Sequence, residues 1–375
     1  MKEDIYTMST SHWKRIVVKV GSALIAPHQQ GCSSHYLLGI AQFIATCRAQ
    51  GCQVILVSSG SVAAGRHRFS DVAEPTVSLK KAMAAAGQAD MMATWDKLFD
   101  FPSAQLLLTQ GDLRDRDRYI SIKNTILTLL EHGLLPIVNE NDAATADQLR
   151  VGDNDNLSAM VAAASNADAL IICSDVKGLY TKNPNLHEDA TLIKQVDDIN
   201  ADIYAMAGGA TSDVGTGGMF TKIEAAEKAV SHGIETMIVN GFESDTFNQL
   251  LKGENPGTLF KSYDVPMKDN LHWMMYTSQI LGELIVANDF CADLEEHDTQ
   301  LVSDDVVSVK GNFSVGDTVL VRKADGTRLA KAKSNYSSCL LHFIADKEDR
   351  EFSNNAQQKT GPLISDKNIA ILEQI

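Results

Sequence analysis

Two lysines in this sequence stand where a lysine can meet a phosphate group. Lys19 lies near the end of the apolar run of residues 16–20, and Gly21 follows that run. Lys222 ends the segment GTGGMFTK, residues 215–222, directly before a helical pattern. Glycines let a backbone approach a phosphate closely, and the positive end of a helix dipole favours its charge. Each lysine could also have no functional role. A lysine at a strand end can simply extend to water, and a glycine-rich segment can be a flexible loop.

Two polar segments carry amide and carboxylate side chains close together in the sequence. Residues 139–142 read Asn-Glu-Asn-Asp after an apolar run, and residues 152–156 read Gly-Asp-Asn-Asp-Asn at the start of a helical pattern. Such side chains can bind both the α-amino group and the α-carboxylate of an amino acid. Helix capping explains one such segment readily, but two so close together less well. A metal cage is a further alternative, although no EF-hand spacing is present.

Two further turns follow apolar runs. Residues 57–65, VSSGSVAAG, read as a strand, a glycine turn and a helix of small residues, whose first N–H groups can face an anion. Residues 174–180, SDVKGLY, could close over a nucleotide, although either turn could also be only a connection. The segment 215–222 lacks the final order of a Walker A loop, and no GxGxxG follows the first strand, which argues against a dinucleotide enzyme.

Together these segments favour phosphoryl transfer to a small acidic metabolite. A carboxylate acceptor is already ionised at neutral pH and needs no general base. The difficulty is to bring one anion against another while charge moves onto the leaving ADP. Positioned lysines and Mg²⁺ reduce that repulsion, so ATP and Mg²⁺ are the expected cosubstrate and cofactor.

The elements that must position these residues predict an α/β fold with a mostly parallel central sheet covered by helices. Short β-branched runs alternate with longer Ala- and Leu-rich segments, which is typical of βαβ units. The expected strands are residues 16–20, 54–58, 103–108, 135–138, 169–173 and 236–239. The expected helices are residues 36–50, 79–98, 119–132, 156–166 and 222–232. Such sheets bind ligands at the carboxyl ends of their strands, where four of the six expected strands run into polar loops.

The C-terminal part of the chain has a different pattern. Residues 252–270 lose helical periodicity and contain two prolines, which is typical of a boundary or linker. Beyond them, the strand-like runs 306–309, 318–322 and 340–344 are separated by turn residues. This pattern predicts a small β-rich barrel or sandwich.

Length and composition limit the class of protein. The 375 residues, 44% hydrophobic and 22% charged, suffice for two globular domains. The net charge of −15 gives no general attraction to nucleic acid or anionic lipid. The six cysteines form no C-x-x-C pair and the histidines lack metal-ligand spacing, so no protein-bound metal is predicted. No apolar run is long enough for a signal peptide or a membrane span, so we expect a cytoplasmic protein without a membrane partner.

Short strings spread over nearly the full length give the chain its resemblance to a known family. They are, in order, VVKVGS, VSSGSVAAGR, AAAGQ, VNENDA, VGDNDNLSA, SDVKGLYT, GTGGMFTK, GTLF and SVKGNFSVGD. In this order and spacing the chain resembles the glutamate 5-kinases, enzymes of the amino acid kinase fold. The resemblance implies ATP-dependent phosphorylation of the γ-carboxylate of L-glutamate, the first step of proline biosynthesis. The tail resembles a PUA domain, a small β-barrel often found in RNA-modifying enzymes.

The resemblance implies a role for each matching residue. The catalytic residues would be Lys19 and Lys222, which stabilise the transferring phosphoryl group, and Asp155, which holds the two lysines in place. The L-glutamate site would comprise Ser59, Gly60, Asn139, Asp142, Asp153 and Asn154. The ATP site would comprise Lys19, Ser174, Asp175, Thr216, Gly217, Gly218, Met219, Phe220, Thr221 and Lys222.

The resemblance also implies a division of the chain and a set of partners. An amino acid kinase domain would span residues 12–262, a linker residues 263–275 and a PUA-like domain residues 276–365. Proline, the end product of the pathway, would inhibit at or near the L-glutamate site. A homo-oligomer is implied as well, although the residues themselves do not reveal the oligomeric state.

Two alternatives remain open from the sequence. Within the same fold, the chain could be an acetylglutamate kinase, an aspartokinase or a carbamate kinase, but aspartokinases usually carry ACT domains and the other two usually lack an added barrel. In a different class, the tail could bind RNA. Residues 271–375 hold about ten basic and about sixteen acidic side chains, contrary to the basic surface that RNA binding requires, so nucleic acid is not an expected partner.

Overall fold

The chain forms two compact units, Met1–Pro266 and Met267–Ile375. The computed structural model describes residues 13–27, 31–69, 74–145, 154–208, 218–290, 301–302, 305–345, 361–365 and 368–372. Of the site residues expected above, Asp153, Thr216 and Gly217 lie outside the described residues.

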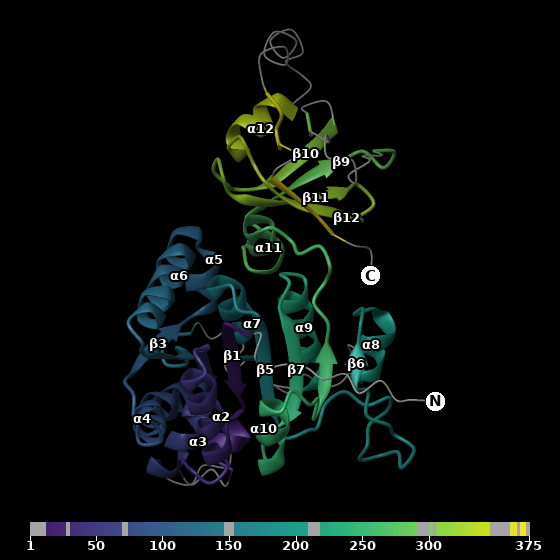
Figure 1. Ribbon diagram of the computed structural model, residues 1–375. Helices are drawn as coiled ribbons and strands as arrows, with labels where there is room; N and C mark the ends of the chain where they lie inside the picture. The colour runs from purple at the N-terminus through teal and green to yellow at the C-terminus, as the bar shows by residue number, and fades with distance from the viewer. Residues whose placement is uncertain are drawn as a thin grey trace. The chain divides into compact units, whose positions relative to one another are not determined.

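The first unit is built on an eight-stranded sheet (Figure 1). Its strands are β1 (Arg15–Val20), β2 (Gln53–Ser58), β3 (Ser103–Leu108), β4 (Leu135–Glu140), β5 (Ala169–Ser174), β6 (Gln195–Val196), β7 (Glu235–Asn240) and β8 (Thr258–Phe260). Their order across the sheet is β3-β4-β2-β1-β5-β7-β8-β6. The six long strands all pair in parallel, and β8 runs antiparallel to β7. The predicted mostly parallel sheet and its six expected strands are therefore confirmed.

Helices cover both faces of this sheet. They are α1 (Ser22–Ile25), α2 (Leu37–Ala49), α3 (Ser61–Gly65), the 3₁₀ turn η2 (Arg66–Arg68), α4 (Val77–Asp96), α5 (Gln110–Arg114), α6 (Arg116–Glu131), α7 (Asn154–Ser165), α8 (Ala201–Met206), α9 (Met219–Val230) and α10 (Ser244–Leu251). The five expected helices correspond to α2, α4, α6, α7 and α9. Helices α2, α4 and α10 share a core with one face of the sheet, whereas α6, α7 and α9 contact strands from the other.

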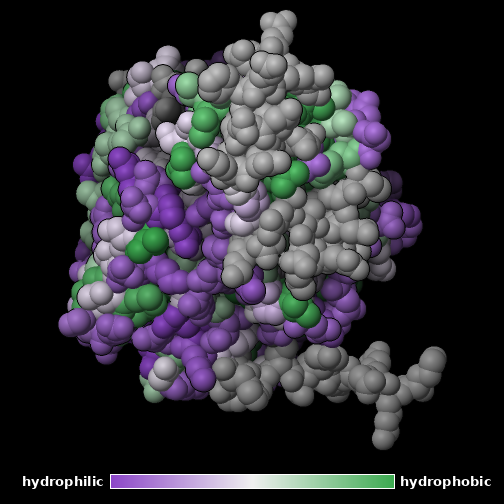
Figure 2. Space-filling view, turned by 90° about the horizontal axis from the view of Figure 1, so that it is seen from above, coloured by the Kyte–Doolittle hydropathy of each residue, from purple (hydrophilic) through white to green (hydrophobic). Residues whose placement is uncertain are grey.

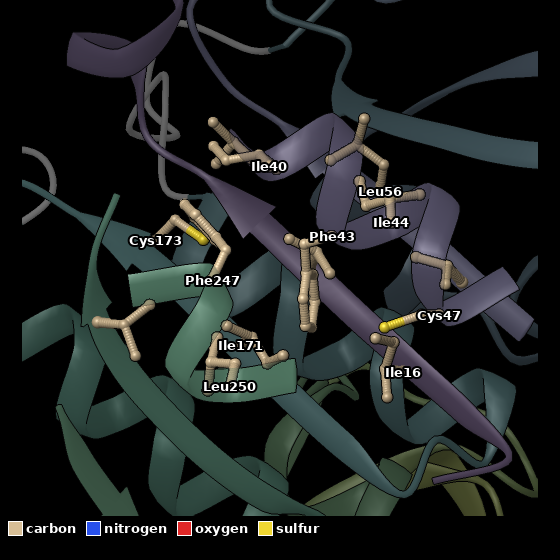
Figure 3. Packing of buried hydrophobic residues seen from close by; sticks show 14 of the residues in the cluster. Ile16, Ile40, Phe43, Ile44, Cys47, Leu56, Ile171, Cys173, Phe247 and Leu250 are labelled. Carbon is tan, nitrogen blue, oxygen red and sulfur yellow. The ribbon is translucent and has the colours of Figure 1, made fainter. Parts of the chain in front are cut away.

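Side-chain alternation along β1 decides to which face of the sheet each side chain points. Ile16, Val18 and Val20 belong to the core shared with α2, α4 and α10. In Figure 3, Ile16 lies near Cys47 of α2, and Phe43 of α2 packs against Phe247 of α10, with their ring centroids 5.8 Å apart. Because successive side chains of a strand point to opposite faces, Lys19 points to the other face, where α7 and α9 pack.

The second unit contains a separate five-stranded mixed sheet with its own core. Its strands are β9 (Gly282–Val286), β10 (Val306–Gly311), β11 (Thr318–Lys323), β12 (Arg328–Lys333) and β13 (Ile369–Ile371), and its helices are α11 (Asp269–Tyr276) and α12 (Ser338–Ala345). The strand order is β10-β9-β11-β12-β13, with β9 and β11 parallel and the other pairs antiparallel. The expected small β-rich unit is present.

One predicted strand of this unit is wrong. Residues 340–344 lie in the helix α12 and not in a strand. Leu341 is buried in the core while Leu340 and Phe343 are 43% and 54% exposed, so one helix face packs and the rest meets solvent. The strand that actually pairs with β11 in this sheet is β12. Its sequence RLAKAK buries only Ala330 and Ala332, so it does not show an apolar run.

The surface is mostly polar on the side drawn in Figure 2, where hydrophobic residues are scattered among hydrophilic ones. Such scattering is normal for a folded protein in water. Within the described residues, no helix is both long enough and apolar enough to span a bilayer.

Candidate active site

The carboxyl ends of four neighbouring strands bring the polar segments together. Strands β4, β2, β1 and β5 are adjacent in the sheet and parallel, so the loops that follow them leave from the same edge. The backbone is tied across this edge, because Ser59 N–H donates to the Val20 carbonyl at 3.0 Å and Gly21 N–H donates to the Cys173 carbonyl at 3.2 Å. The expected location of the site at this edge is thus matched by the positions of its loops.

A buried charge cluster joins β1, α7 and α9. Lys19 Nζ contacts Asp155 Oδ1, and Lys222 Nζ lies 3.1 Å from Asp155 Oδ2. The Thr221 hydroxyl donates to the same Oδ2 at 3.1 Å. Asp155, Lys222 and Lys19 are only 1%, 4% and 6% exposed. The structure therefore brings together the three residues that the family resemblance implies as catalytic.

This cluster holds two ammonium groups and one carboxylate, and Asp175 is a second carboxylate that attracts Lys222. Burial by itself would raise the pKa of Asp155, but the attraction of Lys19 and Lys222 outweighs burial and lowers it. Burial lowers the pKa of Lys222, and the attraction of Asp155 opposes that change. Two buried lysines around one carboxylate are a costly arrangement that adds little to stability, so a functional reason is expected. An anion brought between the lysines would be attracted by both ammonium groups.

Helices α7 and α9 are joined next to this cluster by a second polar contact. Asn156 follows Asp155 on α7. Lys228 of α9 donates to Asn156 Oδ1, and Asn156 Nδ2 donates to Glu224 Oε2 at 3.4 Å. These contacts hold α9 against α7 and so fix the distance between Asp155 and Lys222. Sequence reasoning missed this role for Asn156, because its partners lie 68 and 72 residues away along the chain.

A chain of amide side chains lies beside the charge cluster, starting one residue before Asp155. The Asn154 Nδ2 group donates to Ser59 Oγ at 2.8 Å and to Asn139 Oδ1 at 2.7 Å. The Asn139 Nδ2 group in turn donates to Gln88 Oε1 at 2.9 Å. The structure thus brings together Ser59, Asn139 and Asn154, as expected, and adds Gln88 from α4. The string AAAGQ contained Gln88, but its position inside a helix gave no sign of a site.

Asp142 lies against the same turn of the chain. Its Oδ2 accepts a hydrogen bond from the Ser61 hydroxyl at 2.6 Å. Burial raises the pKa of Asp142, and the bond from Ser61 offsets part of that rise. Between Ser59 and Ser61, Gly60 has a φ of +102°, a left-handed backbone conformation that residues other than glycine adopt only with strain. Gly60 therefore shapes the turn that both Asn154 and Asp142 contact.

The segments expected to meet a nucleotide flank the charge cluster. The helix α9 begins after Gly218, which provides no side-chain cap for the first N–H groups. The Gly218 carbonyl lies 2.9 Å from the Thr221 hydroxyl and shares the one hydrogen of that hydroxyl with Asp155. Phe220 packs against Tyr204 of α8, with ring centroids 5.2 Å apart. Ser174 donates to Asp175 Oδ1 at 3.0 Å. The attraction of Asp175 also raises the pKa of Lys222 slightly against the effect of burial.

Two lysines of β12, Lys331 and Lys333, are engaged within the second unit. Lys331 Nζ donates to the Met275 carbonyl at 2.5 Å, and Lys333 Nζ lies 5.6 Å from the ring centroid of Trp273. Both partners belong to α11, which packs on β12. These contacts do not favour the RNA-binding alternative.

Comparison with known proteins adds independent information. The model of the amino acid kinase family matches residues 14–240. The glutamate 5-kinase 1 of Pseudoalteromonas translucida is 63% identical over 367 residues, which cover 98% of this chain and 100% of that protein. The glutamate 5-kinase of Idiomarina loihiensis is 51% identical over 348 residues, which cover 92% of this chain and 94% of that protein. Among solved structures, a UMP kinase from Bacillus anthracis aligns with a TM-score of 0.48 at 15% identity, over 68% of this chain and 97% of that chain.

Proposed function

This chain belongs to the amino acid kinase family and, within it, to the glutamate 5-kinases, and from this premise we propose that it transfers the γ-phosphoryl group of ATP to the γ-carboxylate of L-glutamate. The product is L-glutamyl 5-phosphate, and the reaction opens proline biosynthesis. The observation that carries the catalytic part of the proposal is the buried contact of Lys19 and Lys222 with opposite oxygens of Asp155.

The acceptor needs orientation more than activation. A γ-carboxylate is ionised at neutral pH, so no side chain has to remove a proton from it. The barrier comes from the repulsion between this anion and the phosphates of ATP. Two buried ammonium groups lower that barrier, because their attraction for the phosphates acts where water is excluded.

Lys19 and Lys222 are the proposed catalytic residues, and Asp155 is the proposed positioning residue. Negative charge spreads over the phosphoryl oxygens and the leaving oxygen as the transfer proceeds. Two ammonium groups fixed on one carboxylate need no rearrangement to meet that charge. Thr221 also donates to Asp155 Oδ2 and so adds a further contact that holds the carboxylate in place.

Magnesium fits this site as an ion carried by the phosphates of ATP. The described residues hold no group of three or more His, Cys, Asp or Glu side chains that could bind a metal ion by themselves. Both oxygens of Asp155 face Lys19, Lys222 or Thr221. When bound, Mg²⁺ neutralises part of the negative charge of the phosphates.

The amide chain and Asp142 form the proposed binding site for the head group of L-glutamate. Oδ1 of Asp142 and Oδ1 of Asn154 are buried and have no hydrogen-bond partner among the described residues. Buried acceptors without partners are costly, so a ligand donor is expected there. An α-ammonium group supplies such donors. Ser59, Gly60, Asn139 and Asp153 belong to the same proposed site.

We propose that the ATP site is formed by the two lysines and the segments that follow β5 and begin α9. Its residues are Lys19, Ser174, Asp175, Thr216, Gly217, Gly218, Met219, Phe220, Thr221 and Lys222, of which Thr216 and Gly217 lie outside the described residues. The uncapped start of α9 supports this assignment, because free N–H groups at a helix N-terminus attract phosphate oxygens.

Four further parts of the proposal concern regulation and organisation. Proline carries the same α-carboxylate and a charged amino group, so the head-group site supports its inhibition at or near the L-glutamate site. We also propose a homo-oligomer and a cytoplasmic location. The proposed division is a kinase domain over residues 12–262, a linker over 263–275 and a PUA-like domain over 276–365.

An ATP-dependent hydroxamate assay tests the function. With Mg²⁺-ATP and hydroxylamine, L-glutamate should give γ-glutamyl hydroxamate, whereas N-acetylglutamate and L-aspartate should give little product. N-acetylglutamate presents an amide where Asp142 requires a charged donor, and L-aspartate is one methylene too short to bring its carboxylate to the lysines. Turnover of N-acetylglutamate without turnover of L-glutamate would overturn the assignment.

A further inference from the structure

Gln88 has a buried amide nitrogen that nothing in the described part of the chain binds. We propose that Gln88 determines acceptor specificity by donating a hydrogen bond from Nε2 to the α-carboxylate of the amino acid. The proposal rests on the function given above and names the residue that binds the α-carboxylate. Nothing in the γ-phosphoryl transfer itself requires this contact, so it acts on the choice and orientation of the acceptor.

A close approach of two helices places Gln88 at the site. A Cβ atom on Gly87 would lie 2.0 Å from the Ser61 carbonyl oxygen, so α4 touches the backbone of α3 at this point. A Cβ atom on Gly65 would likewise lie 2.0 Å from the Met83 carbonyl oxygen. Only glycines permit this approach. As a result the next residue, Gln88, reaches Asn139 at the carboxyl end of β4.

The direction of the amide chain decides which atom of Gln88 is left for a ligand. Asn154 donates to Asn139, and Asn139 donates to Gln88 Oε1. Each amide therefore accepts at its oxygen from the one before it. At the end of this series of amides, Gln88 Nε2 is a donor that has no acceptor among the residues the structure describes, and a carboxylate oxygen is the partner that it would bind.

The other end of the amide chain, at Asn154, and the neighbouring Asp142 offer acceptors instead of donors. Asp142 Oδ1 and Asn154 Oδ1 are both buried without a partner among the described residues. Asp142 and Asn154 bond Ser61 and Ser59, which flank Gly60, so both acceptors belong to one turn. A donor at one end and acceptors at the other match the carboxylate and the ammonium group of a free α-amino acid.

The substitution Gln88→Glu isolates the proposed contact. The new carboxylate still accepts the hydrogen bond from Asn139, so the amide chain is kept, and only the donor Nε2 is replaced by an acceptor. That acceptor repels the α-carboxylate of L-glutamate. The matched control is Gln42→Glu on the exposed side of α2, which makes the same chemical change away from the site.

The experiment compares L-glutamate with L-isoglutamine, which keeps the γ-carboxylate but carries an amide in place of the α-carboxylate. The native protein and Gln42→Glu should prefer L-glutamate. In Gln88→Glu the KM for L-glutamate should rise ~10- to 100-fold, as expected for a lost charge-assisted hydrogen bond. The preference for L-glutamate over L-isoglutamine in kcat/KM should fall by a similar factor, because the amide can donate to the new carboxylate. The KM for ATP should not change.

Each outcome decides the proposal. An unchanged preference ratio in a folded Gln88→Glu variant overturns the role of Gln88, even if both rates fall, because a purely structural residue affects both acceptors alike. A native protein that accepts both acceptors equally also overturns it. If Gln88→Glu unfolds, Gln88→Ala removes the donor without adding charge, and it must then lower the preference for L-glutamate over L-isoglutamine in kcat/KM. Failure of the native protein to phosphorylate L-glutamate would instead refute the proposed function.

Discussion

Gly87 and Gly65 lie in direct backbone contact where α4 passes α3, since a Cβ atom on Gly87 would lie 2.3 Å from the Gly65 amide nitrogen. Because the clashing atoms belong to the backbone, a flexible side chain cannot relieve the overlap by moving aside. The contact therefore sets the distance of α4 from the turn around Gly60.

The first prediction is that Gly87→Ala pushes α4 away from this turn. Overpacking of this kind should lower the free energy of unfolding by ~1 to 3 kcal/mol, measured by chemical denaturation. The KM for L-glutamate should rise more than the KM for ATP, because Gln88 moves with α4. Gly111→Ala on α5 is the control, since its nearest neighbour is 3.5 Å from the new Cβ. Equal stability of Gly87→Ala and the native protein would contradict the contact.

The second prediction concerns the two lysines. Lys19→Ala and Lys222→Ala should each lower kcat by at least ~100-fold, because one fixed charge in a water-excluded site supplies roughly 2.7 to 4 kcal/mol of transition-state stabilisation. The KM values should change less, since Mg²⁺ and backbone N–H groups already balance much of the charge of bound ATP. Lys222→Arg should not restore the rate fully, because a planar guanidinium does not replace a compact ammonium beside Asp155. A near-native kcat in either alanine variant would remove that lysine from catalysis.

The third prediction is a pH dependence from Asp142. Burial raises its pKa, so the carboxylate takes up a proton at a higher pH than an exposed aspartate, whose pKa is about 3.9. The protonated form attracts an α-ammonium group less, and the KM for L-glutamate should therefore rise as the pH falls through this raised pKa. Asp142→Asn should have a high KM with a flatter acid limb. If the native protein and Asp142→Asn share one KM profile, Asp142 does not bind the ammonium group.

The fourth prediction is that the first unit works alone. Each unit has its own hydrophobic core, and every proposed site residue precedes Pro266. A chain that ends at Pro266 should keep measurable kinase activity in the hydroxamate assay. Its folding should first be checked by a cooperative thermal transition. A folded but completely inactive truncation would show that the second unit supplies something the reaction needs.

The sequence by itself determined the six long strands of the first unit and five of its helices, and it predicted the sheet edge at which we propose the site. These features depend on local patterns, because the spacing of apolar residues, alternate in strands and every three to four in helices, is visible in consecutive residues. Local pattern failed in the second unit, where the apolar run at residues 340–344 suits a strand as well as a helix. The packing of Leu341 on the core, with Phe343 in solvent, decides for the helix.

Only the tertiary structure decided which side chains meet. Lys222 and Asp155 are 67 residues apart in the chain, and Gln88 and Asn139 are 51 residues apart. No periodicity relates such pairs, because their distance depends on how parallel strands stack and how closely helices approach. Nothing in the local sequence therefore marked Gln88 as a binding residue. It reaches Asn139 only because Gly65 and Gly87 let two helices touch.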